Sequence, residues 1–132
     1  MTKITSLKMA VRDYECDLQG VVNNAVYQNY LEHARHEFLK SKGVDFAVLA
    51  KAGTNLMVLR AELDYKGSLS SGDAFVVNTV FEQRSRLKFV FLQEIINCSI
   101  DKTVLSAEIT GVAVNQKGRP FAPAELVGLV ED

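Results

Sequence analysis

The stretch DYECDLQGVVNNAVYQNYLEHAR, residues 13–35, contains the change from loop to helix around which the fold is organised. It places a carboxylate, Asp17, three residues before Gly20, and a helical pattern starts soon afterwards at Asn23. An aspartate at such a position suits a turn and the positive end of a helix dipole. A carboxylate is also a general base or a nucleophile in enzymes. These two interpretations of Asp17 lead to different functions.

Helical spacing of apolar residues continues from residue 23 to residue 42, which predicts one long amphipathic helix. Asn23 is the expected N-cap, and Gly43 is a natural residue for the position just beyond the last turn. A short second helical turn is expected over residues 44–51. The apolar positions that define the long helix are Tyr27, Tyr30, Leu31, Ala34, Phe38 and Leu39.

Alternating apolar and polar residues occupy most of the remaining chain and predict β-strands with short connections. Consecutive strands are therefore expected to pair antiparallel, with the long helix covering one face of the sheet. The other face is also partly apolar, so we expect a second copy to cover the exposed edges and faces. This predicts a homodimer and, beyond it, a homotetramer. The predicted strands cover residues 4–12, 57–65, 75–81, 87–100 and 103–115.

Length and composition favour a single domain over residues 1–132 in a cytoplasmic protein. Hydrophobic residues make up 48% of the 132 residues and charged residues 23%, which is a globular balance. The net charge of −1 provides no basic field for nucleic acid or an anionic membrane. No apolar run has the length of a membrane span, and the N-terminus lacks the pattern of a signal peptide. Two cysteines, Cys16 and Cys98, are too few for a disulfide framework.

A set of residues at the loop–helix junction resembles a known family. The set comprises Tyr14, Asp17, Gly20, Val22, Tyr27 and the Glu32-His33-Ala34-Arg35 segment. In this order they resemble the hotdog-fold thioesterases, specifically the 4-hydroxybenzoyl-CoA thioesterase-like group of acyl-CoA thioesterases. The later strands fit as well, so the resemblance covers nearly the whole chain.

The resemblance implies an α+β hotdog fold, in which five or six antiparallel strands wrap around one long central helix. It also implies active sites at a dimer interface. Asn23, Asn24 and Tyr27 additionally resemble a segment of acyl-carrier-protein thioesterases with the same fold. Many relatives carry a histidine at the position of Val21 or Asn24, and this chain does not.

Thioester hydrolysis needs an activated water or a carboxylate nucleophile, together with donors for the oxyanion. Orphan N–H groups at the start of the long helix are suitable donors for a thioester carbonyl. Gly20 allows a ligand to approach the backbone closely. Asp17 then acts as nucleophile or as general base, and Asn24 orients the water or the carbonyl. We therefore take Asp17, Gly20 and Asn24 as the candidate catalytic residues.

Substrate binding is expected at the start of the helix and at a basic turn. Asn23 and Tyr27 have simpler alternative roles, as helix cap and core residue. The basic turn has the Arg and Lys donors needed to hold the phosphates of coenzyme A, although a plain solvated hairpin explains it equally well. The candidate binding residues are Val22, Asn23, Tyr27, Leu31, Arg60, Arg84, Ser85, Arg86 and Lys88.

The hypothesis is therefore an acyl-CoA thioesterase with no metal and no cofactor, coenzyme A being part of the substrate. His33 and His36 share a helix face, but four-apart pairs with glutamates explain them as well as a metal does. Two alternatives remain open. One is an acyl-acyl-carrier-protein thioesterase, and the other is a non-catalytic acyl-thioester binding protein of the same fold. The depth of the acyl pocket is expected to depend on Leu31, Phe38, Leu56 and Val58.

Overall fold

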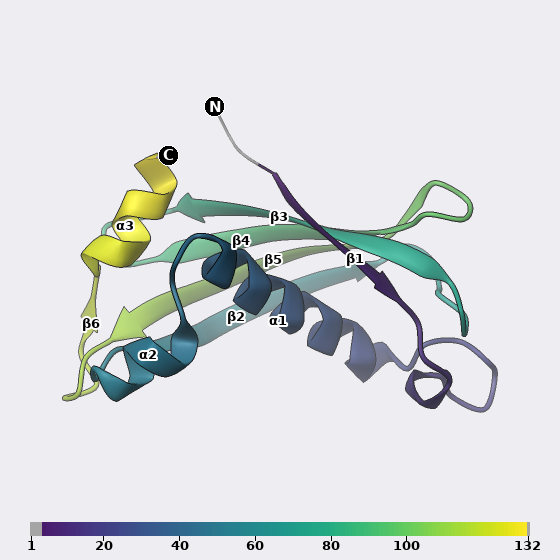
Figure 1. Cartoon of the computed structure of the whole chain (residues 1–132), viewed down its shortest axis with the longest axis horizontal. Helices are drawn as coiled ribbons and strands as arrows, with labels where there is room; N and C mark the ends of the chain where they lie inside the picture. Colours follow the sequence, from purple (N-terminus) through teal and green to yellow (C-terminus); the bar gives the residue numbers. More distant parts are fainter. Residues whose placement is uncertain (1–3, 132) are drawn as a thin grey trace.

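An antiparallel sheet curls around a long helix in this computed structural model, which describes residues 4–131 (Figure 1). The sheet order is β1-β3-β4-β5-β2, with β6 paired to β5. The α+β expectation is confirmed. The strands are β1 Thr5–Ala10, β2 Asn55–Tyr65, β3 Ala74–Gln83, β4 Phe89–Asn97, β5 Lys102–Val114 and β6 Pro120–Phe121, and the helices are α1 Asn24–Ser41, α2 Phe46–Lys51 and α3 Ala124–Glu131.

Helix α1 begins and ends where its capping residues predict. The Asn23 side chain accepts a hydrogen bond from the Ala25 backbone N–H at 3.0 Å, which satisfies one orphan donor of the first turn. At the other end Gly43 has φ +82°, a left-handed conformation that residues with a Cβ rarely adopt. The helix is therefore one residue shorter at each end than the predicted range 23–42.

The buried face of α1 contributes to two neighbouring clusters of the core. Tyr30 and Leu31 pack with Phe75, Ile95 and Leu105 near the start of the helix. Toward its end Phe38 and Leu39 join a second cluster that includes Phe81, Phe89 and Leu126. Burying one such apolar side chain contributes about 1.5–3 kcal/mol. The sheet therefore wraps the helix because two rows of large side chains meet along it.

One expectation about pairing is wrong, because β2 and β3 are consecutive but not neighbours. Strand β2 pairs with β5, and β3 pairs with β1 and β4. The connecting segment 66–73 does not form a hairpin. Instead the Lys66 N–H bonds to the Val104 carbonyl, and the Leu69 carbonyl accepts from the Val22 N–H, both at 2.8 Å. This crossing leaves β2 at one edge of the sheet.

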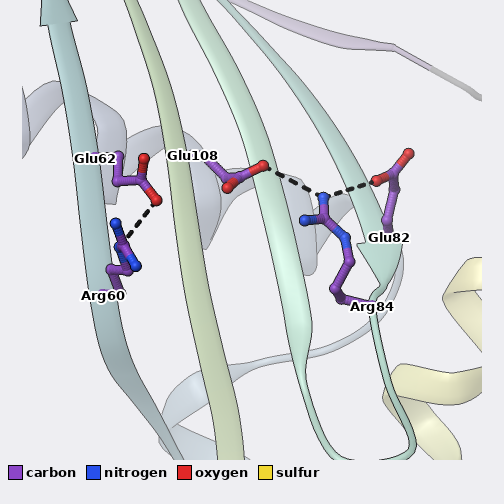
Figure 2. A network of polar contacts seen from close by, with 5 residues as sticks. All are labelled: Arg60, Glu62, Glu82, Arg84 and Glu108. Carbon is purple, nitrogen blue, oxygen red and sulfur yellow. Dashed lines mark hydrogen bonds and ion pairs between the residues drawn. The ribbon is translucent and has the colours of Figure 1, made fainter.

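The outer face of the sheet carries charged side chains among its apolar ones (Figure 2). Arg84 reaches two acids, Glu82 at 3.4 Å and Glu108 at 3.3 Å, and Arg60 pairs with Glu62 at 2.9 Å. The outer face is therefore mixed in character, not uniformly apolar. Within residues 4–131, no helix has the length and hydrophobicity that crossing a membrane requires.

Candidate active site

Asp17 opens a tight loop that brings the chain back to α1. Its backbone N–H bonds to the Val21 carbonyl at 2.9 Å, and the Gly20 N–H bonds to the Asp17 carbonyl at 3.0 Å. Gly20 has φ +81°, so a residue with a Cβ is strained there although nothing lies within 4 Å of where the Cβ would be. A β-bridge between Cys16 and Val22 closes the loop. The backbone of this loop is thus well defined.

The carboxylate of Asp17 takes part in the turn and remains exposed to solvent. Its Oδ1 accepts from the Gln19 N–H at 2.8 Å and from the Val21 N–H at 3.4 Å. The interpretation of Asp17 as a turn residue is therefore correct for Oδ1. Within residues 4–131, Oδ2 has no hydrogen-bond donor, so one carboxylate oxygen is available to water or substrate. The two interpretations of Asp17 are compatible.

The first turn of α1 lies beside this loop and offers a free donor. Asn23 is tied back to the loop, because its N–H bonds to the Glu15 carbonyl at 3.0 Å. Among the described residues, neither the backbone N–H nor the side chain of Asn24 has a partner. The Tyr65 hydroxyl, at the end of β2, donates to the Asn24 carbonyl at 3.3 Å. Asp17, Gly20 and Asn24 therefore belong to one loop–helix junction, as expected.

Tyr27 has a structural role in addition to any contact with substrate. Its hydroxyl accepts from the Leu69 N–H at 3.0 Å, which anchors segment 67–73 against α1. Its ring meets that of Tyr65 edge to face, with the centroids 5.7 Å apart. Burial raises the pKa of Tyr27, and the hydrogen bond from Leu69 opposes this only in part. Tyr27 is thus a neutral phenol that supports the wall of the site.

The sequence reasoning missed Glu15, a buried carboxylate two residues before Asp17. Its Oε1 accepts from the Tyr30 hydroxyl and from the Arg12 backbone N–H, each at 2.8 Å, and Oε2 accepts from the Arg12 guanidinium at 3.1 Å. Burial alone would raise the pKa of Glu15, but these hydrogen bonds outweigh it and lower the pKa. The ionised Glu15 therefore fastens the start of the Asp17 loop to the middle of α1. The Arg12-x-x-Glu15 spacing was the only local signal.

Replacing Tyr30 by Phe is expected to destabilise the protein in a pH-dependent way. The change removes a donor to a buried carboxylate, so the free energy of unfolding falls by about 1.5–3 kcal/mol near neutral pH. Because the pKa of Glu15 is lowered in the folded state, its stabilisation is present above the pKa of an unfolded glutamate. It is lost as the pH falls through the folded pKa. The loss caused by Tyr30→Phe should thus be smaller in acid, as urea unfolding over a pH series will show.

Tyr65→Phe is the matched control, because the Tyr65 hydroxyl bonds to a neutral carbonyl. Its effect on unfolding should not change with pH. Equal losses for Tyr30→Phe at neutral and acid pH would contradict the assigned role of Glu15.

The basic turn lies at the opposite end of the sheet from the Asp17 loop. Strand β3 starts beside segment 67–73 and ends just before Arg84, and its ten residues span about 33 Å. Arg84 and Arg60 are already paired with acids (Figure 2). Ser85 Oγ accepts from the Lys88 N–H at 3.2 Å within the turn. One chain therefore does not bring Arg84, Ser85, Arg86 and Lys88 to its own Asp17.

A groove runs between α1 and the edge strand β2, and we call it the α1–β2 groove. Its part nearer the start of α1, beside Gln28 and Asn29, has a volume of about 270 Å³. It continues into a cavity of about 120 Å³ lined by aromatic side chains, including Phe46, Phe81 and Phe91. Leu31, Leu56 and Val58 line these spaces as expected, whereas Phe38 packs behind Phe81. The residues of the α1–β2 groove include Gln28, Glu32, Arg35, Val58, Ala61 and Ile109.

Three titratable groups, Glu32, Arg35 and His36, line the aromatic cavity, and the first two also line the groove. Burial lowers the pKa of Arg35, and only the charge of Glu32 opposes this. Burial likewise lowers the pKa of His36, whose ring packs against Phe46 at 4.3 Å, so its imidazole is neutral at pH 7. His33 is separate from it and lies 4.0 Å from Glu37. Within residues 4–131, no three His, Cys, Asp or Glu side chains gather as metal ligands.

Comparison with known proteins shows which family shares this loop–helix junction. The sequence profile of the thioesterase-like superfamily matches residues 11–127, which include the Asp17 loop and all of α1. The acyl-acyl carrier protein thioesterase ATL3 of Arabidopsis thaliana is 37% identical over 120 residues. This match covers 91% of the present chain but only 63% of that relative, so the chain spans less than two thirds of its length.

Solved structures show the same fold. A 1,4-dihydroxy-2-naphthoyl-CoA thioesterase from Synechocystis superposes with a TM-score of 0.91 at 20% identity, covering 98% of this chain and 97% of that one. A protein from Aquifex aeolicus described as hypothetical has a TM-score of 0.88 at 31% identity, covering 96% and 98%. The hotdog fold expected from the sequence is confirmed. This chain belongs to the thioesterase-like superfamily.

Proposed function

We propose that this chain hydrolyses acyl thioesters, in the first place acyl-CoA, at the junction of the Asp17 loop and α1. The observation that carries the proposal is the unpaired Asn24 N–H at the N-terminus of α1, beside a loop whose aspartate keeps one free oxygen. The positive end of the helix dipole and this N–H favour a developing oxyanion. Family membership supplies the reaction class.

The reaction proceeds by one of two routes. In the first, Asp17 removes a proton from water while the oxygen of that water attacks the thioester carbonyl. In the second, Asp17 itself attacks, and water then hydrolyses the mixed anhydride. In both routes the electron pair of the carbonyl moves onto its oxygen, which faces the start of α1. The carbonyl re-forms as the C–S bond breaks. In the first route the proton held by Asp17 passes to the leaving sulfur, and in the second the thiolate leaves and takes its proton from solvent. The products are a free acid and the thiol of the carrier.

The geometry supports a site completed by a second copy of the chain. Met57, Val58 and Leu59 on the edge strand β2 are 52%, 56% and 56% exposed, and the far edge of β2 is unpaired. An exposed apolar edge strand favours pairing with another strand. A second copy along β2 would cover the α1–β2 groove and would supply a further basic turn, whereas the turn of the same chain does not reach its own Asp17. We therefore propose a homodimer as the active unit. The homotetramer, built by covering the outer sheet faces, stays a prediction.

The acyl carrier protein is the alternative carrier, and the similarity to the ATL3 enzyme favours it. The decisive measurement is thiol release from matched acyl-CoA and acyl-carrier-protein substrates. Reversing two charges with Arg86→Glu and Lys88→Glu is expected to raise KM by about tenfold for the carrier that binds at the basic turn, because phosphate or acidic-surface contacts are lost. KM for the other carrier should stay within about twofold.

A reversal at Lys117, on the β5–β6 turn, serves as the control and should leave both KM values unchanged. An unchanged KM for both carriers in the Arg86/Lys88 variant would remove the basic turn from the site. Absence of turnover on every thioester would favour the third hypothesis, a non-catalytic acyl-thioester binding protein.

A further inference from the structure

Arg35 stands out in the α1–β2 groove because it is a largely buried cation that forms no ion pair with a described residue, and Glu32 is the one acid whose charge acts on it. Its Nη1 donates to the Gln93 Oε1 at 3.2 Å, and its guanidinium lies 6.0 Å from the centre of the Phe91 ring. Within residues 4–131, Arg35 takes part in no ion pair and in no second hydrogen bond. A guanidinium has several N–H donors, and a buried charge is unfavourable unless it is paired. The groove therefore presents donors that need an acceptor.

Gln93 holds this guanidinium in place. Gln93 is only 4% exposed, and its Nε2 donates to the Leu31 carbonyl and to the Thr79 hydroxyl, both at 3.1 Å. With the amide nitrogen committed in this way, the amide oxygen is left to accept from Arg35. The orientation of Arg35 is thus set by a buried, fully bonded partner, as in a preorganised binding site.

The distance from the proposed thioester position is set by the helix. Leu31 is seven residues beyond Asn24, which is about 10 Å along the axis. The Arg35 side chain leans toward the N-terminus of α1, as helical side chains do, and meets Gln93 near the level of Leu31. About 10 Å corresponds to a zigzag of about eight carbon–carbon bonds. An acyl group of that length, placed along the groove from the proposed thioester position, would reach Arg35 with its far end.

We propose that Arg35 is a specificity-determining residue, which binds a carboxylate or another accepting oxygen at the end of the acyl group remote from the thioester. The inference rests on the proposed function for the position of the thioester. Apolar side chains on the sheet side of the groove, Val58 of β2 and Ile109 of β5, accept the chain itself. The substrate class is then an oxygenated acyl group of medium length, and a plain saturated chain loses this contact.

The test compares two pantetheine thioethers that cannot be hydrolysed, one with an octanoyl-length chain and one with the same chain ending in a carboxylate. Calorimetry of the native protein should show that the carboxylate raises affinity by about tenfold or more. Arg35→Met should abolish this preference and leave the affinity for the plain chain within about twofold. Arg35→Lys should retain part of it, because lysine keeps the charge but not the fork. Lys40→Met, an exposed cation elsewhere on α1, should change neither affinity.

Three results would overturn the inference. The first is a native protein with equal affinity for the two thioethers. The second is an Arg35→Met variant in which the affinity for both thioethers falls equally. The third is a drop in oligomer mass for Arg35→Met in light scattering, which would assign Arg35 to an acid of a second copy. Binding with the expected preference but without hydrolysis of the matching thioesters would contradict the proposed function and leave the inference about Arg35 standing. The two outcomes are distinguishable because the thioether assay does not depend on turnover.

Discussion

Asp17→Asn lowers kcat for thioester hydrolysis by about 10²–10⁴-fold, the range expected when a general base is removed. The fold should be unaffected, since the asparagine oxygen can accept from the Gln19 and Val21 N–H groups that Asp17 Oδ1 binds. The amide cannot take a proton from water, and it is a poor nucleophile. Steady-state release of free thiol measures kcat, and thermal unfolding verifies the fold. KM should change little, because the loop backbone stays in place.

Asp45→Asn is the matched control for this experiment. Asp45 caps α2 with two hydrogen bonds of the same lengths, its Oδ1 accepting from the Ala47 N–H at 2.8 Å and from the Val48 N–H at 3.4 Å. It differs from Asp17 in lying away from the start of α1. Asp45→Asn should therefore leave kcat unchanged. If both variants keep native turnover, Asp17 is a turn residue only, and the catalytic base lies elsewhere.

Leu59→Lys is expected to separate the proposed dimer and to abolish most thioesterase activity. Leu59 is 56% exposed and sits at the irregularity between Val58 and Arg60 on the edge strand β2. A lysine on a sheet edge opposes pairing with a second strand, because burial would desolvate its ammonium group. Light scattering should show the mass halved, and kcat/KM should fall by at least about tenfold as the α1–β2 groove opens to solvent.

Val48→Lys tests whether any exposed apolar residue behaves in this way. Val48 is 64% exposed on α2, outside β2, and its replacement should preserve both mass and activity. A native protein that is monomeric and active would refute the proposed interface outright. An active Leu59→Lys variant of unchanged mass would move the interface away from β2.

Much of the fold was predictable from local patterns. The spacing of Tyr27, Tyr30 and Phe38 predicted α1, and Asn23 and Gly43 predicted its ends to within one residue. Capping and periodicity act over a few residues, so they are visible in one sequence. The position of β2 was not predictable, since the 66–73 segment satisfies its hydrogen bonds with Val22 and Val104. Those partners are distant in sequence.

The residues of the candidate site also fall into two groups, those predictable from their neighbours in sequence and those that depend on distant partners. Asp17, Gly20 and Asn24 are neighbours in sequence, and their grouping at the loop–helix junction followed from the motif alone. The contacts of Glu15 and Arg35 were not predicted, because their partners, Tyr30 and Gln93, lie 15 and 58 residues away. The role of the basic turn stays a prediction, because within one chain this turn lies at the other end of the sheet from Asp17.

By itself, the sequence determined that this chain forms a long capped helix against an antiparallel sheet, with one acid at the helix entrance. These features depend on periodicity, capping and turn chemistry, which operate between near neighbours. Only the tertiary structure decided that β2 is an exposed edge, that Glu15 anchors the Asp17 loop, and that Arg35 is a largely buried cation with no ion pair among the described residues. Burial and pairing across the sheet depend on contacts between segments that are distant in sequence, and the local patterns of a single sequence do not specify those contacts.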